Sequence, residues 1–232
     1  MDDPILEISN LTKKYDNLVA VDGFNLRLNQ GTVHGLVGPN GAGKSTMLSI
    51  ISGLRRKTSG IINFGVAQKE IMLMPDTPEF FGFLTARQIV DLARSPFLLN
   101  ISEEQVEKVI DDVGLSNSID LKVKGFSRGM KQRLGLATTI ISQPKLILLD
   151  EPCSALDPIG RHDVLEIVSE LKQNSTVLFS THILSDVETV CDSVTVVDHG
   201  KTLYEGTVLG ISDGKKSFED AVIELLRPKK EL

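Results

Sequence analysis

One glycine-rich segment has the residue types and spacing that suit the binding of phosphate groups. It matches G-x-x-x-x-G-K-[ST], and it lies between the apolar run Val33–Val37 and further apolar residues from Met47 onward. Glycines let backbone N–H groups turn towards a phosphate, and a following helix directs the positive end of its dipole there. We expect Lys44 to contact the β- and γ-phosphates of a nucleotide and Ser45 to bind Mg²⁺. The expected nucleotide-binding residues of this loop are Gly38, Pro39, Asn40, Gly41, Ala42, Gly43, Lys44, Ser45 and Thr46.

A second candidate lies where the apolar run 146–149 ends in the carboxylates Asp150 and Glu151. A nucleotide site needs a carboxylate for the metal or its water, and a base that orients the attacking water. Successive strand residues point in opposite directions, so these two side chains cannot do the same work. We assign Asp150 to the metal and Glu151 to the water. The alternative, a polar strand end that faces solvent, is common for such a motif taken alone.

The elements that must position these residues alternate between strand and helix, which favours an α/β fold. Short strands are expected at 5–9, 24–28 and 33–37, with an antiparallel pair across the turn Asn29-Gln30-Gly31. Wholly apolar strands at 71–74, 146–149, 177–180 and 194–197 are typical of a parallel sheet covered on both faces. Residues 77–126 are helical in pattern, are punctuated by Pro96, and carry a capping box at Ser102–Gln105. They predict a helical subdomain inserted into one domain, 1–232, which ends in a helix and tail at 211–232.

Composition bounds the class of protein. The 232 residues are 41% hydrophobic, and 25 basic side chains against 31 acidic ones give a net charge of −6. This composition excludes a disordered or collagenous chain and argues against a protein that coats nucleic acid. Two cysteines, Cys153 and Cys191, are too few for a disulfide framework and fit a reducing compartment. Since no run approaches the roughly 18 apolar residues of a membrane span and no signal peptide is recognisable, we expect a soluble chain.

Five further segments make the chain resemble the ATP-binding subunit of an ABC transporter from about residue 5 to 210. Residues 126–133 stand where that family has its signature, and residues 154–157, Ser-Ala-Leu-Asp, match its D-loop. His182 matches the switch histidine, Tyr15 stands at the adenine-stacking position, and Asp76 occupies the Q-loop position. The resemblance implies a P-loop NTPase (RecA-like) core with a parallel sheet, an N-terminal antiparallel β subdomain and an inserted α-helical subdomain.

The resemblance also implies roles for these residues. It makes the chain an ATPase that uses ATP and Mg²⁺, with Glu151, His182 and Lys44 catalytic and Tyr15 against adenine. The signature residues that would contact ATP held by a second copy are Ser127, Arg128, Gly129 and Met130. Ser127 and Gly129 are expected to open a helix whose positive end meets the γ-phosphate. The metal ligands would be Ser45, Asp150 and Asp76. Asp157 would bridge two subunits at the D-loop, or else cap the helix that begins near Pro158. His34, His162 and His199 are expected to be structural or exposed, and Cys153 to be a small buried residue.

The implied partners are a second cassette, with ATP at the interface, and integral membrane permease subunits that place the chain on the cytoplasmic face of the membrane. Nucleic acid is not expected as a partner. Arg128 and Met130 depart from the commonest signature in a way typical of bacterial drug, antibiotic and polysaccharide exporters. Asp76 departs from the usual glutamine. The apolar run 80–84 is expected to be the coupling surface, or else to pack within the subdomain. The alternative functions are a non-transport ABC ATPase acting on ribosome or DNA, and a metabolite kinase with the same loop.

Overall fold

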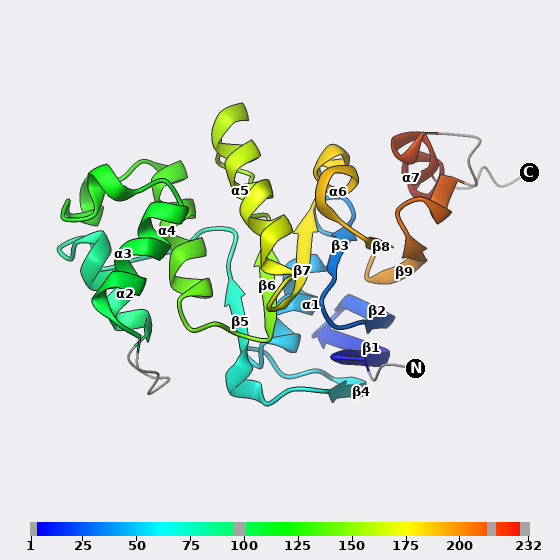
Figure 1. The fold of residues 1–232 in the computed structure, drawn as a ribbon. Coiled ribbons are helices and arrows are strands. Elements are labelled where there is room, and N and C mark those ends of the chain that lie inside the picture. Colours follow the sequence, from blue (N-terminus) through cyan, green and yellow to red (C-terminus); the bar gives the residue numbers. More distant parts are fainter. Residues whose placement is uncertain (1–3, 95–100, 213–216, 228–232) are drawn as a thin grey trace, which may run out of the picture.

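Strands and helices alternate along the chain in the computed structural model, which describes residues 4–94, 101–212 and 217–227 (Figure 1). The strands are β1 (Leu6–Tyr15), β2 (Leu18–Leu28), β3 (Val33–Val37), β4 (Ser59–Phe64), β5 (Ile71–Met74), β6 (Leu146–Asp150), β7 (Thr176–Thr181), β8 (Ser193–Asp198) and β9 (Lys201–Thr207). The helices are α1 (Lys44–Ile51), α2 (Ala86–Arg94), α3 (Glu103–Asp112), α4 (Arg128–Ile140), α5 (Pro158–Leu171), α6 (Leu184–Val190) and α7 (Phe218–Leu226). The α/β fold class is therefore confirmed.

Within the described residues, the strands form two sheets. The larger has the order β5-β6-β7-β3-β8-β9, in which β5 to β8 run parallel and β9 is antiparallel to β8. The smaller is antiparallel, with the order β2-β1-β4. The expected antiparallel pair across Asn29–Gly31 is wrong, because β2 and β3 lie in different sheets. The turn leads the chain from one sheet to the other, and β2 finds its partner in β1 instead.

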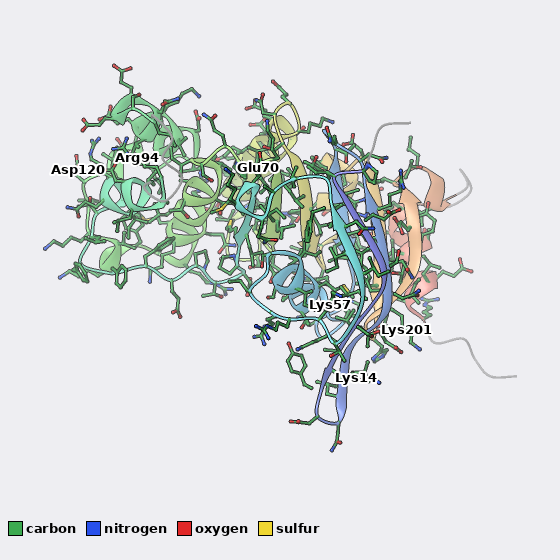
Figure 2. All side chains as sticks on the ribbon, turned by 90° about the horizontal axis from the view of Figure 1, so that it is seen from below. Lys14, Lys57, Glu70, Arg94, Asp120 and Lys201 are labelled. Carbon is green, nitrogen blue, oxygen red and sulfur yellow. The ribbon has the colours of Figure 1, made fainter. Side chains whose placement is uncertain are left out.

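Apolar cores on both faces of the large sheet hold the layers together. Met47, Leu48 and Ile51 of α1 pack between the two sheets, against Phe24 of β2 and Leu148 of β6. On the other face of the large sheet, α5 and the helical region share one core with the apolar side chains of β6 and β7. The burial of both faces explains why the central strands are wholly apolar. Charged side chains, among them Lys14, Lys57 and Asp120, lie at the periphery (Figure 2).

The helices α2, α3 and α4 gather at one end of the large sheet (Figure 1). The capping box at the start of α3 is confirmed, since Ser102 Oγ accepts from Gln105 N at 3.2 Å and Gln105 Oε1 accepts from Ser102 N at 2.8 Å. The helical prediction is wrong for residues 77–85, which contain no helix. Pro96 and the predicted tail at 228–232 lie outside the described residues. The boundaries of the helical subdomain stay a prediction. Within the described ranges, no helix is long and apolar enough to cross a membrane.

Candidate functional site

The phosphate-binding loop connects β3 to α1, as the sequence predicts. Its glycines meet tight constraints. Gly43 has φ +100°, and a Cβ there would come within 2.4 Å of Ala20 O, while a Cβ on Gly38 would come within 2.2 Å of Val197 O. Side chains at either position would displace the loop from its neighbours. The loop is therefore held in a shape that only residues without a Cβ allow at these two positions.

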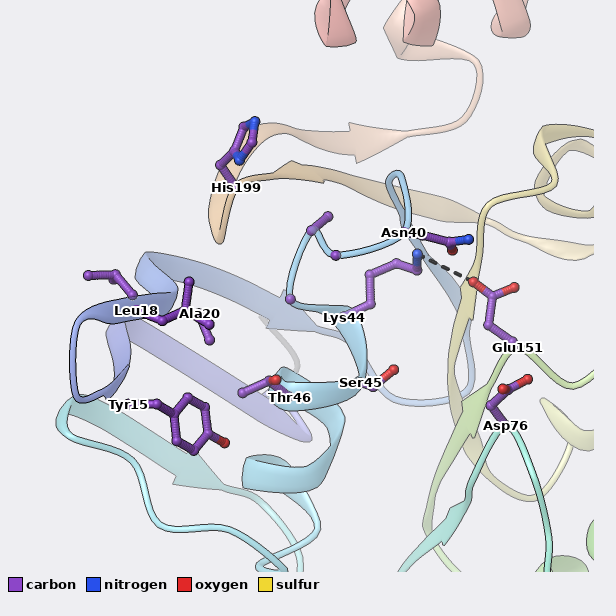
Figure 3. A pocket seen from close by; sticks show the side chains of 14 residues that line it. Tyr15, Leu18, Ala20, Asn40, Lys44, Ser45, Thr46, Asp76, Glu151 and His199 are labelled. Carbon is purple, nitrogen blue, oxygen red and sulfur yellow. Dashed lines mark ion pairs between the residues drawn. The ribbon is translucent and has the colours of Figure 1, made fainter.

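Lys44, the first residue of α1, is buried at the centre of the site. Its Nζ donates to Gly38 O at 2.7 Å and to Pro39 O at 3.3 Å. It also lies 3.3 Å from Glu151 Oε1 (Figure 3). Its ammonium group thus curls back over the loop and neutralises a carboxylate that follows β6. A nucleotide phosphate would have to compete with that carboxylate for the same charge.

Glu151 is held between two catalytic candidates. Its Oε1 faces Lys44, and its Oε2 lies 2.8 Å from His182 Nδ1, so the three predicted catalytic side chains converge. Its backbone adopts φ +49°, a left-handed conformation that is costly for a residue with a side chain. The N–H of Glu151 donates to Ser180 O and Ser180 Oγ, both at 3.1 Å, and Gln132 Nε2 donates to Glu151 O at 3.2 Å. These bonds fix a strained residue, as expected where orientation matters for chemistry.

Asp150 has a different environment, as the alternation of strand side chains predicts. It is buried, and its Oδ1 accepts a hydrogen bond from Ser180 Oγ at 2.6 Å. Ser180 therefore orients both acidic residues, one through its hydroxyl as donor and the other through its oxygens as acceptors. Neither Ser180 nor Gln132 is apparent as a site residue from the sequence, because each acts through a partner far along the chain.

A pocket of about 440 Å³ opens over the loop and contains most of the predicted nucleotide-binding residues. Tyr15 stands at its rim, where Lys13 Nζ lies 4.6 Å from the ring centroid and Arg55 donates to the hydroxyl at 3.2 Å. Sequence reasoning missed part of this lining, namely Leu18, Val19, Ala20 and His199. The pocket as a whole is lined by Tyr15, Leu18, Val19, Ala20, Asn40, Gly41, Ala42, Gly43, Lys44, Ser45, Thr46, Asp76, Glu151 and His199 (Figure 3).

His199 is as exposed as predicted, yet it reaches the site through the turn between β8 and β9. The next residue, Gly200, donates to Ala42 O at 3.0 Å, which places this turn against the phosphate loop. The other predictions for histidine are confirmed. His162 is exposed. His34 is buried between Ser193 Oγ (2.7 Å) and Thr195 Oγ1 (2.8 Å), and burial lowers the pKa of its ring to about 3. Cys153 is likewise buried, which raises the pKa of its thiol to about 12 and disfavours a reactive thiolate.

Asp76 lies in the same pocket as Ser45 and Glu151. Its Oδ1 accepts from Ser154 Oγ of the D-loop segment at 2.9 Å and lies 3.9 Å from Arg128 of the signature segment. Mg²⁺ in proteins usually keeps several of its water ligands, so it needs only a few oxygen ligands from the protein. Ser45, Asp76 and the buried Asp150 offer such oxygens, although the described ranges contain no group of three or more acidic, histidine or cysteine side chains that could hold a metal ion.

The signature segment begins α4, which is the helix start that the sequence predicts. Ser127 is the N-cap, and its Oγ accepts from Met130 N at 3.2 Å. Asp157 caps α5 in the same way, with Gly160 N donating to its Oδ1 at 2.7 Å, so the capping alternative for this residue is confirmed. Both helix starts line a second cavity of about 790 Å³, away from the phosphate loop of their own chain. That cavity includes Ser127, Arg128, Gly129, Met130 and Asp157.

A P-loop NTPase is defined by a parallel sheet in which the phosphate loop after β3 leads into α1, with a carboxylate from the end of β6 beside the lysine of the loop. A family model described as "ABC transporter" matches residues 21–154. The chain therefore belongs to the ABC transporter family, whose ATP-binding domains are ATPases that hydrolyse ATP to power transport.

Known relatives agree with this membership. The chain is 38% identical over 208 residues to the ABC transporter ATP-binding protein YxlF of Bacillus subtilis, covering 87% of this chain and 70% of YxlF. It is 36% identical to the lantibiotic transport ATP-binding protein SrtF of Streptococcus pyogenes, covering 94% of this chain and 98% of SrtF. It is 37% identical to the bacitracin transport ATP-binding protein BcrA of Bacillus licheniformis, covering 87% of this chain and 69% of BcrA. A solved ATP-binding subunit of an ABC transporter superposes with a TM-score of 0.86 at 27% identity, covering 96% of this chain and 100% of that one.

Proposed function

We propose that this chain binds and hydrolyses MgATP between two copies of itself, and that it powers a membrane exporter through separate permease subunits. The observation that carries the proposal is the position of Glu151, whose carboxylate lies between Lys44 and His182 at the phosphate loop. Glu151 can act as a base beside Lys44, the residue that would contact the phosphates, and His182 contacts that base. This arrangement suits the hydrolysis of ATP.

In this proposal each side chain has a defined role. Lys44 leaves Glu151 for the β- and γ-phosphates, which frees the carboxylate to orient the attacking water and accept its proton. His182 keeps Glu151 in place and hydrogen-bonds the γ-phosphate. Tyr15 stacks on adenine. Ser45, Asp150 and Asp76 would hold Mg²⁺, which neutralises charge on the phosphate oxygens.

The separation of the two cavities supports a pair of cassettes. The phosphate-loop pocket contains no signature residue, whereas Ser127 and Gly129 line the second cavity at the positive end of α4. A γ-phosphate in the first pocket would therefore receive the signature from a second copy, with Asp157 at the same face. Since ATP would contact both copies and ADP would lack the γ-phosphate, hydrolysis would weaken the pair.

Two features support a membrane permease as partner. Phe81 and Phe83 are 64% and 68% exposed, with ring centroids 5.7 Å apart, while Phe80 and Leu84 pack against the core of the helical region. The segment 80–84 thus offers a pair of exposed aromatic rings to another protein. The relatives SrtF and BcrA are named for the transport of a lantibiotic and of bacitracin, which agrees with export.

Purification of the tagged chain from its own cells tests the proposal. An integral membrane protein should be recovered in stoichiometric amount from detergent-solubilised membranes. The variant Phe81→Ser/Phe83→Ser should lose that partner and keep its ATPase activity, because these rings lie outside the phosphate-loop pocket. Recovery with ribosomes or DNA, and with no integral membrane protein, would contradict the exporter and favour the non-transport alternative.

A further inference from the structure

An ion pair with a buried carboxylate joins α5, which begins after Asp157, to α6, which begins two residues after His182. Arg161 of α5 donates through Nε to Asp186 Oδ1 of α6 at 2.5 Å, and its Nη2 donates to Ser185 Oγ at 2.9 Å. The carboxylate of Asp186 is 1% exposed, and the guanidinium of Arg161 is 29% exposed. The two helices lie side by side over the large sheet (Figure 1).

Burying the carboxylate of this pair costs desolvation free energy. Asp186 Oδ2 is buried and has no hydrogen-bond partner among the described residues. Burial raises the pKa of Asp186, while the hydrogen bond from Arg161 opposes that shift. Apolar side chains of similar volume often stabilise a fold as well as a buried ion pair does, or better. Stability alone is therefore a poor reason for a charge at this position.

The two ends of the pair are each one helical turn from a functional segment. Arg161 N donates to the carbonyl of Asp157, the N-cap of α5, at 2.9 Å. Asp186 N donates to the carbonyl of Ile183 at 3.2 Å, and Ile183 directly follows His182. The bridge from Arg161 to Asp186 thus connects the D-loop end of α5 with the segment that carries the catalytic histidine.

We propose that Arg161 and Asp186 are positioning residues that hold His182 against Glu151 and transmit the position of Asp157 to it. This inference rests on the proposed function and deepens it. When a second cassette contacts the D-loop, any shift of the first turn of α5 reaches His182 through a rigid, two-point contact. Hydrolysis then depends on the interface being closed, while nucleotide binding at Tyr15 and Lys44 does not.

The expected effect falls on turnover. Replacing the pair by apolar residues, Arg161→Met/Asp186→Leu, should keep the melting temperature and the KM for ATP close to those of the natural chain. The same variant should lower kcat roughly 10- to 100-fold, the loss expected when a catalytic group is misplaced by about 1 Å. Lys172→Met is the matched control, since it removes the ion pair from Lys172 to Asp192 at the opposite end of α5, 3.2 Å long.

Steady-state kinetics of these variants decide the inference. A folded double variant with natural kcat would overturn it, since the pair would then be merely structural. If the double variant fails to fold, Arg161→Lys is measured instead, because it keeps a positive charge beside Asp186 and removes the two-point contact of the guanidinium. A natural kcat for Arg161→Lys would likewise overturn the inference. Glu151→Gln is tested in parallel for ATP-dependent dimerisation. If it dimerises while the double variant turns over normally, the inference alone falls; if it stays monomeric, the proposed function falls with it.

Discussion

Glu151 and Lys44 form a largely buried ion pair, and this pair should weaken ATP binding. The two side chains are 12% and 6% exposed, and their charged atoms are 3.3 Å apart. At an effective dielectric constant of about 20, such a pair gains ~5 kcal/mol of Coulomb energy. Desolvation of both ions offsets most of this gain. We therefore take a net stabilisation of roughly 1.5 kcal/mol for the pair, which is at the low end of the coupling energies of close charge pairs. Glu151→Gln removes the competitor of the phosphates, so it should tighten ATP binding about tenfold.

Fluorescence titration with a non-hydrolysable ATP analogue measures this effect, at protein concentrations low enough to keep the chain monomeric. Glu166→Gln is the control, because it removes the same charge from an exposed position on α5 whose partner is the exposed His162. Its Kd should match that of the natural chain. Equal affinities for the natural chain and Glu151→Gln would refute the reasoning, as would equal tightening by the control.

Substitutions at three further residues test single side chains. Asp76→Gln restores the residue usual in the family and should keep or raise basal hydrolysis; an inactive variant would show that the bond from Ser154 to Asp76, 2.9 Å long, has a role of its own. Tyr15→Ala should raise the KM for ATP about fivefold through loss of an aromatic contact worth ~1 kcal/mol, and Tyr15→Phe should not. His34 is neutral when folded, with its pKa lowered to about 3, so the unfolded chain binds a proton that the folded one does not. Between pH 7.5 and 5 the free energy of unfolding should fall by roughly 2 kcal/mol more in the natural chain than in His34→Gln, as chemical denaturation can measure.

The sequence predicts the site best where the chemistry is local. The phosphate loop, the acidic strand end and the helix start at Ser127 depend on neighbours within a few residues, and the structure has each in the expected element. The central parallel strands are also predicted well, because burial on both faces makes them wholly apolar.

The missed features depend on partners distant in the sequence. Strand β4 has mostly exposed side chains, and β9 lies at a sheet edge with four of its seven residues exposed. Neither strand therefore has the apolar run of a central strand. The change of sheet after Asn29–Gly31 follows from pairing with β1, which a turn signal cannot specify. The partners that Gln132, Ser180 and Asp186 contact lie 19, 29 and 25 residues away in the sequence, respectively. No local sequence pattern marks such contacts.

The association of two copies around ATP is the central claim, and the molar mass of Glu151→Gln in solution tests it most directly. With MgATP, light scattering should give about twice the 25.3 kDa of one chain, because the variant holds ATP without cleaving it. With MgADP, or after Lys44→Ala is added, the mass should return to that of one chain. A Glu151→Gln protein that binds MgATP and stays at the mass of one chain would contradict the account.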